Sequence, residues 1–420
     1  MVAMNPTKQE INNLPPETEV QFLPMESVSE DGSLNLETTR PIFEVSSGYT
    51  YFAEGDVTFA KITPCFENGK GAIMRNLQNS VGFGTTELTV IRPGPSLNNE
   101  YLYYLTISRD FRKNGEAWMY GAGGQKRVPD DFVRELRFAF PPLSEQQAIA
   151  DFLESETERI DLLIGKKKKF VELLKEKRTA LISHAVTKGL NPKVKMKLSG
   201  VEWLGDMPEH WEVKRLKDLL LHKKGAIKTG PFGSQLLSSE MYESEVKVYN
   251  QRSVIDNDFE FGENYISEEK FLELKEFQTY PGDFLITTRG TIGRCAILPE
   301  NSEKGILHPC LMRLQTEKRK VQDRFLEILI EESNFILEQL KIKSNGTTID
   351  VIYQDSLKNV LVLIPPLPEQ QNIVAYLDRE MSKIDSLMSK VETAIEKLKE
   401  YRTALISAAV TGKIDVREVA

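Results

Sequence analysis

Two sets of polar residues lie in loops rich in glycine, one set in each half of the chain. Asn and Gln can bond adenine through two hydrogen bonds, Arg and Lys can bond guanine, and Thr or Ser adapts to either base. Backbone N–H groups at glycines can approach phosphate. The candidates are Lys61, Asn68, Lys70, Thr85, Thr86, Gln125, Lys126 and Arg127 in the first half, and Ser234, Gln235, Gln251, Arg252, Arg289, Thr291, Arg294, Asn345 and Thr347 in the second. Each residue alone is more simply explained as a solvated turn former, so the hypothesis rests on the sets.

No catalytic constellation accompanies these loops. The segment GAGGQKR from Gly121 lacks the spacing and the Ser or Thr of a phosphate-binding loop, and no GxGxxG follows a predicted strand. The Pro-Pro pairs are preceded by Phe140 and Ile364, where the motif of amino-methyltransferases needs a polar amide or acid. The histidines have no Ser, Cys or metal partner by spacing. We therefore expect no catalytic residue, no metal and no cofactor in this chain.

Composition bounds the class of protein. A chain of 420 residues suits two or three domains. No apolar run is long enough to cross a bilayer, the N-terminus lacks the apolar core of a signal peptide, and the three cysteines form no CxxC pair. These features predict a cytoplasmic protein with reduced thiols and no membrane partner. The net charge of −8 leaves nucleic acid open, because local basic stretches occur and basic partners could neutralise phosphates.

An internal repeat organises the chain. The segment PPLSEQQAIADFL from Pro141 and the segment PPLPEQQNIVAYL from Pro365 begin two stretches of more than forty residues, which align without a gap and share about half of their residues. Both end in nearly the same sequence, RTALISHAVT and RTALISAAVT. The period is too long for a solenoid, so it indicates duplication of one large unit, a globular part followed by a long helix.

Each repeat predicts one helix of about 40 residues, about 60 Å long. Gly189 and Gly412 lie where the helices should end. A helix this long with a continuous apolar seam needs a partner, and the other copy is the obvious one. Long core helices, or pairing with another chain, are the alternatives. The predicted seams are Ile149, Leu153, Ile160, Leu163, Phe170, Leu174 and Leu181 in the first helix and Ile373, Leu377, Ile384, Leu387, Val391, Leu398 and Leu405 in the second.

The duplication extends into the globular parts. Both contain a Gly-Asp turn that leads into a strand and a polar loop, in EGDVTFAKI from Glu54 and in PGDFLITTRG from Pro281. Further strands are predicted at LTVIRP from Leu88, and helices near 101–112 and 323–341. The expected fold is α+β, with two mixed α/β globular domains joined by two long α-helices in an antiparallel coiled coil, and an internal pseudo-twofold duplication. The expected boundaries are 1–140, 141–198, 199–364 and 365–420.

At this point the motifs resemble a known family. PPLxEQQ followed by a long helix ending in RTALISxAVT, together with the segment SGVEWLGDMPEHWEVKRLKDL from Ser199, closely resembles the specificity subunits of type I restriction–modification systems. The segments EGDVTFAKITPCFENGKGA and LITTRGTIGR resemble their recognition domains. The first globular part has no WLG..P.HW leader, through a shortened start or through divergence, so the packing at its N-terminal end is left open.

The resemblance implies a division of labour. Two target-recognition domains would each read one half of a split DNA sequence, and the paired helices would fix the separation of the halves. Two modification subunits, which methylate adenine, and two restriction subunits with a motor and a nuclease would join this frame. The chain itself would be non-catalytic. The other candidates are a methyltransferase fragment, the recognition subunit of a related multi-subunit methylating endonuclease, and a coiled-coil scaffold with no DNA role.

Overall fold

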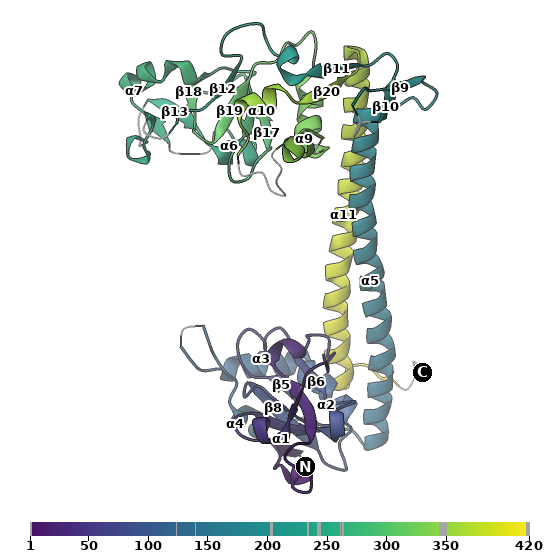
Figure 1. The fold of residues 1–420 in the computed structure, drawn as a ribbon. Coiled ribbons are helices and arrows are strands. Elements are labelled where there is room, and N and C mark those ends of the chain that lie inside the picture. The colour runs from purple at the N-terminus through teal and green to yellow at the C-terminus, as the bar shows by residue number, and fades with distance from the viewer. Residues whose placement is uncertain are drawn as a thin grey trace. The chain divides into compact units, whose positions relative to one another are not determined.

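The computed structural model describes residues 2–122, 124–138, 140–201, 205–232, 235–241, 245–260, 262, 264–333, 335–343 and 351–416. The chain forms two compact units: unit 1 is Met1–Lys169 with Val391–Ala420, and unit 2 is Phe170–Lys390. Two long helices, α5 (Leu143–Lys188) and α11 (Leu367–Val410), each contribute to both units (Figure 1). The two units meet inside α5 and inside α11 and not at the ends of these helices. The domain boundaries predicted at 141, 199 and 365 therefore stay predictions.

The head of unit 1 is built on two four-stranded sheets. One sheet has the order β1 (Val2–Met4), β8 (Leu88–Pro93), β5 (Val57–Ala60), β6 (Gly71–Ile73), with all neighbours antiparallel. The other has the order β3 (Thr39–Pro41), β2 (Glu19–Leu23), β7 (Val81–Gly84), β4 (Thr50–Ala53), and in it β2 and β7 run parallel. The helices of this head are α1 (Ile42–Val45), α2 (Asn99–Ile107), α3 (Arg109–Trp118) and α4 (Asp130–Glu135).

The head of unit 2 also has two four-stranded sheets. The first has the order β12 (Ile227–Thr229), β19 (Leu311–Leu314), β16 (Phe284–Thr287), β17 (Cys295–Ile297), all antiparallel. The second has the order β14 (Tyr265–Ile266), β13 (Val246–Tyr249), β18 (Gly305–Leu307), β15 (Gln278–Thr279), and in it β13 and β18 run parallel. Its helices are α6 (Gln251–Ile255), α7 (Glu268–Glu273), α8 (Asp323–Glu327), α9 (Phe335–Lys343) and α10 (Gln354–Lys358), with a π-helical stretch at Ile328–Glu332.

Unit 2 contains two further strand pairs that precede and follow this head. They are the hairpin of β9 (Met196–Leu198) and β10 (Asp206–Pro208), and the antiparallel pair of β11 (Glu212–Arg215) and β20 (Leu361–Ile364).

The two heads have the same topology. In chain order, β1 to β8 of unit 1 correspond to β12 to β19 of unit 2, with the same sheet order and the same single parallel pair. In each head one apolar core contains residues from both sheets, with Phe52 and Val90 in unit 1 and Tyr249 and Leu285 in unit 2. The shared topology confirms the prediction that the duplication includes the globular parts, although their sequences have diverged.

The Gly-Asp turns have the same structural role in both heads. A carboxylate oxygen of Asp56 accepts a hydrogen bond from the N–H of Ala53, and one of Asp283 accepts from the N–H of Tyr280, both at 2.8 Å. Both aspartates are buried, at 1 % and 3 % exposure, and burial raises the pKa of the Asp283 carboxyl. Each turn starts the strand that positions a candidate loop, which explains why the motif survives in both copies.

The start of α5 is fixed to the head of unit 1 by Gln146. Its Nε2 donates to the carbonyls of Pro141 at 2.9 Å and Ser96 at 3.2 Å, and its Oε1 accepts from the N–H of Asn98 at 2.9 Å. The side chain is buried, with 1 % exposed. All three partners are backbone groups, so the amide satisfies polar atoms that burial would otherwise leave unpaired.

The start of α11 repeats this arrangement with Gln370. Its Nε2 donates to the carbonyls of Pro365 at 2.9 Å and Lys320 at 3.0 Å, and its Oε1 accepts from the N–H of Gln322 at 2.9 Å. This residue is fully buried. The first glutamine of each Glu-Gln-Gln motif thus joins a head to a helix, a role that the sequence pattern did not indicate.

Replacing Gln370 with Leu should destabilise unit 2. The N–H of Gln322 and two carbonyls, of which the Pro365 carbonyl takes part in a buried bond, would lose their partner, and one buried unsatisfied group costs about 1–3 kcal/mol. Gln371→Leu is the matched control, because the neighbouring amide is exposed. We expect a lower urea midpoint, followed by far-UV circular dichroism, for Gln370→Leu and little change for Gln371→Leu; equal midpoints would contradict the assigned role.

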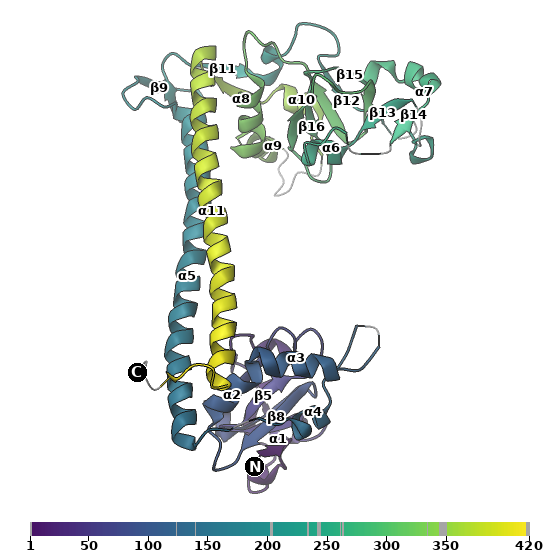
Figure 2. The same ribbon diagram turned by 180° about the vertical axis from the view of Figure 1, so that it is seen from behind.

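The two long helices run antiparallel within each unit. In unit 1, Arg402 of α11 forms an ion pair with Asp161 of α5 at 3.2 Å. In unit 2, Arg178 of α5 lies 3.8 Å from Asp385 of α11. The residue number thus rises along one helix as it falls along the other, and both views show the helices side by side (Figures 1 and 2). The predicted antiparallel pairing is confirmed.

The predicted seam was wrong at three positions. Leu163, Phe170 and Leu387 are exposed, at 40 %, 42 % and 40 %. Their C-terminal neighbours Ile164, Val171 and Met388 lie toward the partner helix instead. Two adjacent apolar residues fit the same spacing, and only the position of the partner helix decides which one is buried.

Most other local predictions hold. Strands β5, β8 and β16 lie where they were expected. The predicted helix at 101–112 is two helices, α2 and α3, because the Ser108 side chain caps a new helix by accepting from the N–H of Phe111. Gly189 and Gly412 follow the long helices with φ of 74° and 69°, as a C-terminal stop requires. Among the described helices, none has both the length and the apolar character needed to span a membrane.

Candidate nucleic-acid interface

The glycine-rich loop of unit 1 is closed at its base by backbone pairing. Tyr120 and Arg127 pair across its base through two backbone hydrogen bonds, of 3.2 and 2.9 Å. A Cβ on Gly121 would lie 2.5 Å from the carbonyl oxygen of Gln125, so only glycine fits there. Gln125 and Lys126 are exposed between the paired residues, and the loop that follows α3 projects from unit 1 (Figure 2). The loop therefore presents an amide and an ammonium group to solvent.

Arg127 is already paired in this structure. Its Nε and Nη2 bond the two carboxylate oxygens of Glu87, at 2.9 and 2.7 Å. This hydrogen bonding lowers the pKa of the Glu87 carboxyl. A bidentate pair of this kind stabilises the base of the loop and orients the guanidinium, whose Nη1 and second Nη2 hydrogen remain as donors for a guanine. Glu87 is thus the partner of a candidate residue, and the sequence did not reveal this pairing.

The other candidates of unit 1 divide into engaged and exposed residues. Lys70 donates from Nζ to the carbonyl of Met25 at 3.2 Å, and Thr85 accepts from the N–H of Glu87 at 3.2 Å. Lys61 is half-buried at the end of β5. The exposed members are Asn68, Thr86, Gln125 and Lys126.

The second set is engaged to a similar extent. Gln251 donates from Nε2 to the carbonyl of Thr291 at 3.1 Å, which joins two candidate loops. The Arg252 guanidinium bonds Asp256 at 3.1 Å.

Arg294 and Gln235 are also bonded. Arg294 forms an ion pair with Glu331 at 2.9 Å, and Gln235 accepts from the N–H of Phe232 at 2.9 Å. Arg289 is exposed, and among the described residues no hydrogen bond or ion pair engages its guanidinium. Ser234, Asn345 and Thr347 lie outside the described residues.

Each head has a hollow at the same place in its topology. In unit 1 the N–H of Val128 bonds the carbonyl of Lys61 at 2.9 Å, and in unit 2 the N–H of Ile352 bonds the carbonyl of Thr288 at 2.9 Å. A hollow of about 330 Å³ beside the first contact is lined by Lys61, Tyr120, Arg127 and Asp130, among others. A hollow of about 430 Å³ beside the second is lined by Phe232, Gln235, Arg289 and Tyr353, among others. The two heads thus share the backbone contact beside the hollow, whereas the residues that line the hollow differ.

Exposed aromatic residues border both hollows, and sequence reasoning missed them. Tyr120 is 68 % exposed, Phe232 56 % and Tyr353 64 %. Their positions next to the candidate loops were the signal that could have found them. Among the described residues, no group of three metal-binding side chains is arranged to hold an ion. Hydrogen bonding, ion pairing and stacking are therefore the chemistry that these surfaces offer.

A family model now identifies the class of protein. The model of the type I restriction modification DNA specificity domain matches residues 9–172 and 208–397. The chain therefore belongs to this family. Its class is that of proteins with the DNA specificity domain of type I restriction–modification systems.

Individual relatives agree with this class. The chain is 48 % identical over 136 residues to the specificity subunit of the type I restriction enzyme EcoAI of Escherichia coli, a match that includes 32 % of this chain and 23 % of that subunit. It is 26 % identical over 334 residues to the MjaVIII specificity subunit of Methanocaldococcus jannaschii, with 77 % and 72 % of the two chains included. The match to the EcoAI subunit thus spans less than a quarter of that relative's length.

Solved structures share the fold. One comes from a study of complex assembly and conformational transition of the type I R-M system, with a TM-score of 0.72, 18 % identity, and 99 % and 98 % of the two chains included. The HsdS subunit from Thermoanaerobacter tengcongensis gives a TM-score of 0.58 at 18 % identity, with 98 % and 97 % included.

Proposed function

We propose that this chain reads a two-part DNA target, one half with each head, as the recognition subunit of a type I complex. The observation that carries the proposal is the pair of hollows at one place in a shared topology, lined by different residues. The shared sheet topology would place each head on the duplex in the same way, and the different residues that line the two hollows would select different base sequences.

The two sets of loop residues are the proposed DNA contacts. In unit 1 Gln125 and Lys126 are the foremost candidates, because both are exposed between the paired residues Tyr120 and Arg127. In unit 2 the exposed guanidinium of Arg289, which lines the same hollow as the exposed Tyr353, offers a guanine contact beside a stacking surface. The remaining members of both sets would support these contacts.

The proposed partners supply the chemistry. Two methyltransferase subunits would dock on the chain and modify adenine, and two restriction subunits would supply the motor and the nuclease, in the cytoplasm. The net charge of −8 fits this division, since basic partner surfaces would then make many of the phosphate contacts.

Mapping of methylated adenines tests the proposal. The chain would be expressed with its modification partner in a host that lacks other adenine methylation, and the DNA read by single-molecule sequencing. We expect one asymmetric motif with two fixed halves and an unread spacer. Methylation with no motif, or with a single uninterrupted motif, would argue against two independent reading heads.

A single change at the tip of the first loop should affect one half-site. Gln125→Ala removes an exposed amide that can make two bonds to adenine, and we expect a loss of about 1–3 kcal/mol in binding of the first half-site only. Gln78→Ala, an exposed amide on the 3-10 turn Gln78–Ser80 of the same head, is the control. Binding by the complex to DNA altered in either half would be compared by titration; an equal loss for both variants would remove Gln125 from the interface.

A further inference from the structure

Unit 1 has a polar hollow, the joint hollow, that the proposed DNA contacts do not use. Its volume is about 300 Å³, and it is lined by Glu100 and Tyr103 of α2, Glu154 and Glu158 of α5, and Arg402 of α11, among others. All of these residues belong to unit 1. The joint hollow therefore lies where the first head meets both long helices.

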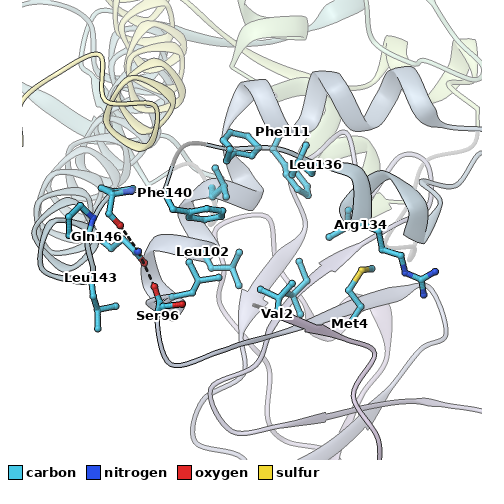
Figure 3. A pocket seen from close by; sticks show the side chains of 17 residues that line it. Val2, Met4, Ser96, Leu102, Phe111, Arg134, Leu136, Phe140, Leu143 and Gln146 are labelled. Carbon is cyan, nitrogen blue, oxygen red and sulfur yellow. Dashed lines mark hydrogen bonds between the residues drawn. The ribbon is translucent and has the colours of Figure 1, made fainter.

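The matching place in unit 2 can be found residue by residue. The N–H of Asn98 bonds Gln146 and the N–H of Gln322 bonds Gln370, and α2 and α8 begin at the next residue in each case. Figure 3 shows Gln146 at this anchor point of unit 1, with its bond to the Ser96 carbonyl. Counted from these anchors and from the Pro-Pro pairs, the matched positions are Glu100 with Arg324, Tyr103 with Glu327, and Glu154 with Asp378.

In unit 2 an arginine side chain occupies this place. Arg324 donates from Nε and Nη2 to Asp378 of α11, at 3.2 and 2.9 Å. The same guanidinium pairs with Glu327 at 3.1 Å and with Glu332 at 2.7 Å. One planar group with several N–H donors thus joins the second head to a long helix through three carboxylates, a task for which an ammonium group is less suited.

In unit 1 the acceptors are kept, but the arginine is not. Glu100 stands at the position of Arg324, and it pairs with Arg75. Glu154 and Glu158 are exposed, and within the described part of the chain no hydrogen bond or ion pair engages their carboxylates. Two like charges one helical turn apart repel each other. A cation in the joint hollow would remove this repulsion.

The Tyr103 hydroxyl is an independent sign of a ligand. The side chain is buried, with 9 % exposed, and none of the described residues forms a hydrogen bond with its hydroxyl. Buried polar groups are nearly always hydrogen-bonded. Gly32, which also lines the joint hollow, keeps side-chain atoms away from this hydroxyl, because a Cβ there would clash with it. The counterpart Glu327 accepts a bond from an arginine, so both heads have an oxygen acceptor at this position.

We propose that the joint hollow receives one arginine side chain of the modification subunit, whose guanidinium takes the place that Arg324 holds in unit 2. The inference rests on the proposed function, because it assigns a contact of the proposed partner. Glu154, Glu158 and the Tyr103 hydroxyl would accept the N–H groups.

The size of the joint hollow and the charge of the chain favour this occupant. A hollow of about 300 Å³ admits a side chain, whereas a helix has a diameter of about 10 Å and does not fit. The net charge of −8 favours a basic partner surface. The bond would fasten the first head to α5 as Arg324 fastens the second head to α11.

Binding of N-acetyl-arginine methylamide to the full chain tests the chemistry. Saturation-transfer NMR should show saturable binding, and Glu154→Gln with Glu158→Gln should weaken it by at least about tenfold. Glu392→Gln is the control, because this glutamate is exposed on α11 in the same unit and does not line the joint hollow. N-acetyl-lysine methylamide should bind more weakly. Equal binding of the two probes, or equal binding to all variants, would overturn the proposal.

Assembly with the modification subunit tests the source of the arginine. The double variant should weaken assembly by at least about tenfold in a mass-photometry titration, and Glu392→Gln should leave it unchanged. Arg75→Glu with Glu100→Arg keeps that ion pair in reversed order and places a guanidinium at the position of Arg324. This exchange should fill the joint hollow, keep the thermal midpoint of the chain, and block both the probe and the partner.

The two measurements separate the possible failures. Probe binding with normal assembly of every variant would overturn the partner's arginine as the occupant and indicate a free guanidinium compound instead. That result would leave the proposed function intact. A chain that assembles with no modification subunit at all would overturn both the inference and the proposed function.

Discussion

Exchange of residues 1–140 for the first head of another member of this family is expected to change one half of the methylated sequence and to leave the other half unchanged. The physical reason is that each head has its own pair of sheets and its own apolar cores, and every described strand pairs within its own unit. The base-reading surfaces of unit 2 therefore keep their structure when unit 1 is replaced. The effect is a complete change of specificity at one half-site.

Methylation mapping with the modification partner measures this outcome. The Ser108 hydroxyl caps α3, and the next residue, Arg109, donates its N–H to the Ser407 hydroxyl of α11 at 2.8 Å. The donor head should therefore keep a serine or threonine cap before its equivalent of α3, so that this N–H stays in place. Exchange of 199–364 is the reciprocal control and should alter the opposite half. A chimera that changes both halves, or neither, would contradict modular reading.

Lengthening both long helices by one heptad should change the unread spacer between unaltered half-sites. Both helices continue from one unit into the other, and seven residues added after Lys167 in α5 and after Val391 in α11 keep the apolar seam in phase. The added length is about 10 Å, close to three base pairs at about 3.4 Å each. Three base pairs also rotate one half-site relative to the other by about a quarter of a helical turn or more.

The variant should therefore prefer a longer spacer or lose binding. Four residues inserted at each of the same positions break the phase of the seam and form the control, which should lose stability instead. Binding to a series of DNA duplexes with different spacers gives the measurement. If the heptad variant kept the original spacer at full affinity, the partner subunits and not the helices would set the separation.

The repeat, the long helices and the duplicated heads could be predicted because each rests on a local pattern. Pro-Pro, Glu-Gln-Gln and the Gly-Asp turn sit at fixed places in both copies, and each has a local structural consequence. The apolar seam of the long helices could be predicted only in part. Leu163 and Ile164 both fit its spacing, and the position of the partner helix decides which of the two is buried.

The candidate DNA contacts stay a prediction, and the sequence did not indicate the partners that several of them have in the fold. Arg127 is a candidate guanine contact, and its guanidinium bonds Glu87, forty positions earlier in the chain. Gln251 was chosen as a base reader, yet its amide bonds the backbone of Thr291, forty positions later. Pairings at this distance depend on how strands bring loops together, and no local pattern contains that information.

The joint that Gln146 and Gln370 make has an evolutionary consequence. Within the part of the chain that the structure describes, each amide forms its hydrogen bonds with main-chain atoms of its head and of the Pro-Pro segment. These bonds depend on the path of the backbone and not on which side chains the head carries. A gene segment that encodes a new head can then recombine ahead of an old helix without a matching change in the helix. This tolerance accounts for two helices that remain about half identical beside heads whose sequences have drifted far apart.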